Sequence, residues 1–298
     1  EISCSLVGSE MCIRDRENQW GFVDFNRPMV AINQWEQAAD SMYTLCGKDR
    51  IHPSTDGHLV MAYLFLKAQG LAGKPVADIR IDGAGKKVTR SDNCRVSDLS
   101  VSSDNLTFTY EAKSLPYPID TSYYDNEKHT QADALSVIPF MDEMNYEGLS
   151  VSGLSDGYYG LTIGGEFIGR FTARELERGI NMALLQNTPQ YKQAMKIRQM
   201  NEERWLKERK MREFYWVEYN LMRKTGMLWA CDEAAVDTLR KYRPHDIFLQ
   251  WNGDLWLQYM HKGIREDCVN EQQNLVDRIY EQNKPIPLRI EIKKFTNL

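Results

Sequence analysis

The sequence predicts an α/β protein in which a short βα segment is followed by a β-rich module and a mainly helical C-terminal region. The apolar residues repeat with helical spacing before Pro75, alternate over short segments after it, and return to helical spacing from Thr172. We therefore expect three parts, at residues 17–74, 75–171 and 172–298. A chain of 298 residues with 42% hydrophobic content is long enough for one large domain or two modest ones.

Composition and charge exclude several functional classes. The 37 basic and 42 acidic residues are spread along the chain, which argues against binding to nucleic acid. The longest apolar stretch, Leu59–Leu66, is far shorter than the roughly 20 residues that cross a bilayer, so we expect no membrane span. Six cysteines occur without a CxxC pair, which argues against a zinc ribbon, a redox motif or a disulfide scaffold. The sequence predicts no cofactor and no metal.

The first sixteen residues do not read as part of the fold. They lack the basic start, apolar core and small-residue cleavage site of a secretory signal. They look instead like translated adaptor sequence, so residues 1–16 are interpreted as a non-native leader. We expect the natural chain to start upstream, which leaves the compartment open.

The predicted elements of residues 17–74 are a strand, two helices and a polar loop. Trp20–Phe25 has the aromatic and β-branched residues of a buried strand. Asn26-Arg27-Pro28 predicts the start of a helix that runs to about Ala39. A second helix is expected from Asp56 to Gln69, where Gly70 stops it. Because that helix is apolar on nearly every face, we expect it to be largely buried.

The β-rich module is predicted from short alternating segments and one clear hairpin. Gly164-Gly165 joins the two hairpin strands, since two glycines supply the positive φ angles of a tight turn. The predicted strands cover residues 76–81, 88–101, 106–110, 135–140, 158–163 and 166–171.

Helix signals dominate after Thr172. Thr172 and Glu175 form a capping box, and Thr188-Pro189 opens a long charged helix that is expected to reach about Lys224. Further helices are predicted over residues 232–282. Leu288–Ile292 then reads as a terminal strand.

The candidate catalytic residues lie in the motif Asp49-x-x-His52-Pro53, in the polar loop before the second helix. An acyl-transfer triad needs an imidazole that takes a proton from a serine, and a carboxylate that orients this imidazole. Asp49 and His52, three residues apart in a turn, fit that requirement. The spacing alone is weak evidence, because a loop salt bridge or a helix-capping arrangement also gives it.

The surrounding sequence resembles the SGNH (GDSL-type) hydrolases, in their bacterial carbohydrate-esterase-like branch. DRIHPSTDGHLVMAYLFLKAQGL is similar to that family's final conserved block, FVDFNRPMVAINQ to the segment before it, and GLSDGYYGLTIGGEFIGRFTARELERGINMA to its C-terminal extension. The resemblance implies that residues 17–74 are the C-terminal remnant of a flavodoxin-like three-layer α/β/α domain. It implies Asp49 as the orienting carboxylate, His52 as the general base, and a periplasmic or secreted location.

The resemblance also implies a carboxylic ester hydrolase that acts on an acetylated carbohydrate or another small ester. The family's serine block and oxyanion-hole blocks do not occur in these residues, and Ser3, Ser5 and Ser9 lie in the leader. We therefore expect the chain alone to be inactive. We also expect the remnant to expose apolar surface, including Val23, Phe25 and Leu64, that the rest of the domain would cover.

Two alternatives remain open from the sequence. Asp49, His52, Asp56 and His58 include metal-ligand residue types crowded within ten positions, although Asp56 is better explained as a first-turn cap. His129, His245 and His261 are interpreted as exposed polar residues. The other functional hypothesis is a non-catalytic module for carbohydrate binding or oligomerisation, and the oligomeric state is left open.

Overall fold

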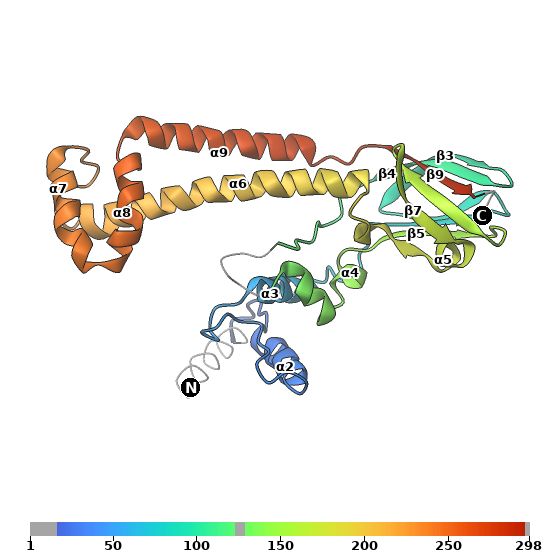
Figure 1. Ribbon diagram of the computed structural model, residues 1–298, viewed down its shortest axis with the longest axis horizontal. Coiled ribbons are helices and arrows are strands. Elements are labelled where there is room, and N and C mark those ends of the chain that lie inside the picture. Colours follow the sequence, from blue (N-terminus) through green and yellow to red (C-terminus); the bar gives the residue numbers. More distant parts are fainter. Residues whose placement is uncertain (1–16, 123–128, 296–298) are drawn as a thin grey trace. The chain divides into compact units, whose positions relative to one another are not determined.

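The computed structural model describes residues 17–122 and 129–295, and these form two compact units (Figure 1). One unit contains the described residues up to Thr188 together with those from Pro287 onward, and the other is Pro189–Ile286. The predicted mixed α/β fold with a β-rich part and a helical part is confirmed. The proposed leader, 1–16, lies outside the described residues.

The first unit contains two sheets that pack face to face. The four-stranded sheet has the order β2 (Lys87–Asp92), β1 (Ala77–Asp82), β5 (Glu147–Ser152), β8 (Ile180–Asn181). The five-stranded sheet has the order β3 (Cys94–Val101), β4 (Asn105–Ala112), β9 (Leu288–Lys294), β6 (Tyr158–Ile163), β7 (Glu166–Thr172). β1 and β5 are parallel, and the other strand pairs are antiparallel.

The core of this sandwich follows from the alternation of apolar residues along the strands. Ile79 and Ile81 of β1 pack in the same cluster as Ile290 and Ile292 of β9, and all four are at most 2% exposed. The predicted terminal strand is confirmed, and it lies between β4 and β6. The last strand therefore belongs to the sandwich, although it follows the helical unit in sequence.

Two local predictions in the sandwich are confirmed in detail. Gly164 and Gly165 adopt φ angles of 60° and 85° and connect β6 to β7. The Thr172 hydroxyl accepts a hydrogen bond from the Glu175 N–H at 3.2 Å, while the Glu175 carboxylate accepts one from the Thr172 N–H at 2.7 Å. This capping box begins α5 (Ala173–Arg178), which packs on β5.

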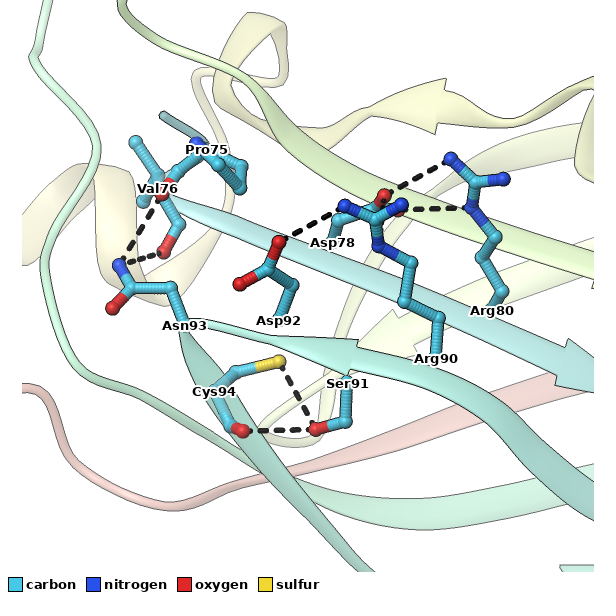
Figure 2. A network of polar contacts seen from close by, with 9 residues as sticks. All are labelled: Pro75, Val76, Asp78, Arg80, Arg90, Ser91, Asp92, Asn93 and Cys94. Carbon is cyan, nitrogen blue, oxygen red and sulfur yellow. Dashed lines mark hydrogen bonds and ion pairs between the residues drawn. The ribbon is translucent and has the colours of Figure 1, made fainter. Parts of the chain in front are cut away.

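A polar network fixes the start of β1 (Figure 2). The buried Asp78 carboxylate contacts the Arg90 guanidinium at 2.9 Å and the Arg80 guanidinium at 3.0 Å. Asn93, at φ 54° between β2 and β3, donates its amide to the carbonyls of Pro75 and Val76. These bonds hold the segment that leads into β1, because they give the Pro75 and Val76 carbonyls a donor.

Two of the predicted strands are wrong. Residues 20–25 form no strand, since a strand needs a neighbouring strand for its hydrogen bonds and the described residues supply none. Residues 135–140 are not extended either. They overlap the 3₁₀ helix η1 (Gln131–Ser136) and the short helix α4 (Phe140–Glu143).

The predicted helices of residues 17–74 are confirmed as α2 (Asn26–Glu36) and α3 (Thr55–Ala68). Leu59, Val60 and Tyr63 of α3 are buried in a cluster with Ile119 and Ile138. The expectation that α3 is largely buried is wrong for the described residues, because Phe65 is 45% exposed and only five of its 14 residues are buried. Only one face of α3 packs within this unit.

The second unit is helical, as predicted. α6 (Pro189–Val217) passes into a π-helical turn, η3 (Glu218–Met222), and lies beside α9 (Lys262–Gln282) (Figure 1). α7 (Glu233–Tyr242), η4 (Arg243–His245) and α8 (Ile247–Tyr259) connect them. The core includes Phe214, Val217 and Trp256, all 0% exposed. Among the described residues, no helix has the length and apolarity needed to cross a membrane.

Candidate active site

The loop that carries Asp49 and His52 is closed by backbone hydrogen bonds at its base. Cys46 and Pro53 form an isolated antiparallel bridge, and the Gly47 N–H donates to the His52 carbonyl at 2.8 Å. Arg50 adopts φ 56°, and its N–H donates to the Gly47 carbonyl at 2.9 Å. The loop is therefore a tight turn with a defined shape.

Leu45 anchors this loop to both helices. Its N–H donates to the Asn33 side chain of α2 at 3.0 Å, and its carbonyl accepts hydrogen bonds from the Ser54 N–H and hydroxyl, both at 3.0 Å. A side chain at Gly57 would overlap the Leu45 carbonyl oxygen, so glycine permits the close approach of α3. These contacts therefore fix both ends of the loop.

Asp49 and His52 contact each other directly. The His52 Nδ1 lies 2.5 Å from the Asp49 Oδ2, as the turn spacing predicted. Because an ionised carboxylate only accepts hydrogen bonds, this contact places the imidazole proton on Nδ1 and leaves Nε2 as an acceptor. The His52 side chain is 83% exposed and that of Asp49 is 48% exposed. The imidazole edge that carries Nε2 is therefore available to a reacting group.

Hydrogen bonds keep Asp49 ionised. The His52 side chain and the N–H groups of Ile51 and His52 lower the pKa of the Asp49 carboxyl to about 2. A negative charge beside Nδ1 is what an orienting carboxylate requires, because it stabilises the imidazolium that forms when His52 accepts a proton.

Replacing His52 with alanine should raise the pKa of Asp49 from about 2 towards the ordinary value of about 3.9. The reason is that the His52 side chain makes the largest contribution to the lowered value. The folded-state pKa lies below the unfolded one, so Asp49 stabilises the fold above pH ~4, and this contribution is lost as the pH falls towards ~2. A titration of the Asp49 carboxyl carbon by NMR measures the change. His58→Ala is the control, and an unchanged pKa in His52→Ala would contradict the hydrogen bond.

Two nucleophilic side chains near the pair are occupied or unactivated. Ser54 is only 2% exposed, and its hydroxyl forms hydrogen bonds with the Leu45 carbonyl and the Asp56 carboxylate. Burial and the nearby Asp49 raise the pKa of the Cys46 thiol, so it is not activated as a thiolate. Neither residue meets the requirements of a nucleophile for His52.

Asp56 forms a second histidine–carboxylate contact that the sequence did not predict. Its buried carboxylate accepts from the Gly57 N–H at 2.8 Å and lies 3.4 Å from the His129 Nδ1. His129, interpreted from the sequence as an exposed polar residue, has a side chain that is 36% exposed and that contacts this carboxylate. In the described ranges 17–122 and 129–295, no three His, Cys, Asp or Glu side chains gather in a way that could hold a metal ion. Asp49 and Asp56 instead pair with different histidines.

One protein family and one solved structure are similar to this chain. Residues 195–284 match the family described as the diltiazem deacetylase C-terminal helical domain, within the helical unit. A solved structure of a gut microbial diltiazem-metabolizing enzyme is 41% identical, with a TM-score of 0.90, over 96% of this chain. The chain spans 65% of the length of that structure's chain. No curated protein matches the chain.

Proposed function

We propose that this chain is part of an ester hydrolase that removes an acetyl or similarly small acyl group from a small molecule. The observation that carries the proposal is the 41% identity, over 96% of the chain, to a diltiazem-metabolizing enzyme. The deacetylase name of the family matched by residues 195–284 supports the same reaction class. Acetylated carbohydrates are one substrate class that fits the SGNH resemblance.

We assign the base and orienting roles to His52 and Asp49. In the proposed reaction His52 Nε2 takes the proton of a serine hydroxyl as the serine oxygen attacks the ester carbonyl. The imidazolium then gives that proton to the departing alcohol, which leaves an acyl-enzyme. Water attacks the acyl-enzyme with His52 again as base, and the carboxylic acid is released.

In this proposal, the serine and the oxyanion-hole donors come from residues that are not among the 298 of this sequence. The apolar surface of the N-terminal segment supports this. Trp20 is 63%, Phe22 51% and Trp35 81% exposed, and α2 buries none of its residues. Val23, Phe25 and Leu64 are only partly buried. Such a surface is expected where further structure packs.

The experiment compares residues 17–298 with a longer protein that also contains the preceding coding residues. The short chain should hydrolyse an activated aryl acetate no faster than its own His52→Ala variant, since the base has no serine to activate. The longer protein should show turnover that is lost with His52→Ala. Hydrolysis by the short chain that is lost in its His52→Ala variant would contradict the proposal, because it would show that residues 17–298 supply their own nucleophile.

A further inference from the structure

The first unit contains a cavity of about 600 Å³ that is separate from the exposed Asp49–His52 contact. Its walls come from α3, from the segment that leads into β1, and from the chain between β4 and β5. Cavities of this size are in the range that holds small-molecule ligands. The apolar walls include Leu59, Ala62, Leu66, Val76, Leu115 and Phe140.

The walls are held in place by hydrogen bonds that do not involve a ligand. Asn93 donates to the Val76 carbonyl at 2.9 Å and to the Ser114 hydroxyl at 3.2 Å (Figure 2 shows Asn93 beside Val76). Asn145, 0% exposed, accepts from the Tyr117 N–H at 2.8 Å and donates to the Tyr117 carbonyl at 2.9 Å. The cavity is therefore built from fixed backbone and spans two segments distant in sequence.

The polar side chains that remain for a ligand are an ammonium and an imidazole. The Gln131 side chain accepts a hydrogen bond from the Asp120 N–H and donates one to the Tyr117 hydroxyl. Lys74 and His58 line the cavity, and their side chains make no hydrogen bond or ion pair with the part of the chain that the structure describes. No carboxylate is among the described residues that line it. An apolar cavity whose free polar groups are an ammonium and an imidazole complements an apolar molecule that carries one negative charge.

We propose that this cavity binds an apolar carboxylate, with the Lys74 ammonium paired to the ligand's carboxylate and its hydrocarbon body against α3 and Val76. A cationic ligand of the same shape is disfavoured, because the described residues that line the cavity include no carboxylate to pair with it. The binding does not depend on ester hydrolysis, so this proposal and the proposed function fail independently.

The test titrates the 298-residue chain with 2-naphthoate, 2-naphthamide and 2-naphthylmethylammonium by isothermal calorimetry. We expect 2-naphthoate to bind the tightest and the amide about tenfold more weakly, as expected for loss of a charged hydrogen bond. Lys74→Met should also weaken 2-naphthoate about tenfold or more. Lys87→Met, at an exposed position of β2, is the matched control and should bind like the wild type.

A second variant fills the cavity without relying on charge. Ala62 is exposed at the cavity wall, so Ala62→Phe should keep the fold, as a thermal melt by circular dichroism checks, and should abolish binding. In wild type, 2-naphthoate should shift the methyl NMR signals of Val76 and Leu115. The proposal is overturned if the ammonium compound binds as tightly as the carboxylate, if Lys74→Met or Ala62→Phe binds like wild type, or if no saturable binding occurs up to about 1 mM.

Discussion

On the proposed serine mechanism, His52→Ala in the longer protein should lower kcat/KM for an aryl acetate by about 10⁴-fold or more. Nε2 of His52 is the acceptor that the Asp49 contact leaves open, and without it the serine hydroxyl keeps its proton. Steady-state kinetics measure the loss. KM should change little, because the imidazole acts on the reacting groups rather than on the remainder of the substrate.

Asp49→Ala should cost about one to two orders of magnitude less than His52→Ala, since orientation and charge support are partial contributions. His245→Ala, at an exposed position of the helical unit, is the control and should keep activity within a few-fold of wild type. A His52→Ala enzyme that retained more than about a tenth of its activity would rule out the general-base role.

The shape of the Asp49–His52 loop was predictable because its information is local. Asp49 and His52 meet because they are three positions apart in one turn, and Gly70 marks the end of α3 in the sequence itself. The hairpin at Gly164-Gly165 and the capping box at Thr172 were predictable for the same reason. Each depends on backbone conformations that only a few residue types favour.

The failures arise where the structure depends on distant partners. The stretch 20–25 has strand composition, but pairing decides whether it becomes a strand. Residues 135–140 are a short apolar run, and such runs do not distinguish a strand from a buried helical segment. Ala134, Ile138 and Phe140 are buried against α3 instead. The His129–Asp56 contact joins residues 73 positions apart, and no spacing rule predicts it.

The helical unit depends on a buried carboxylate at the end of α6. Glu218 is 1% exposed and accepts hydrogen bonds from the Trp256 indole N–H at 2.8 Å and the Trp229 backbone N–H at 2.9 Å. It lies in the π-helical turn η3, where the backbone departs from the regular helix. Trp256 therefore supplies both a large buried ring and a hydrogen bond to this turn.

Trp256→Ala should destabilise the helical unit by about 3–5 kcal/mol, because it leaves a cavity where a 0% exposed ring packed and removes a donor from buried Glu218. Urea denaturation followed by far-UV circular dichroism measures this loss. Trp251→Ala changes the same residue type on the same helix at a position that is 66% exposed, so it should cost less than about 1 kcal/mol. Trp256→Phe retains most of the ring but not the N–H, and should fall between the two. Equal losses for Trp256→Ala and Trp251→Ala would show that α8 does not pack on η3 as described.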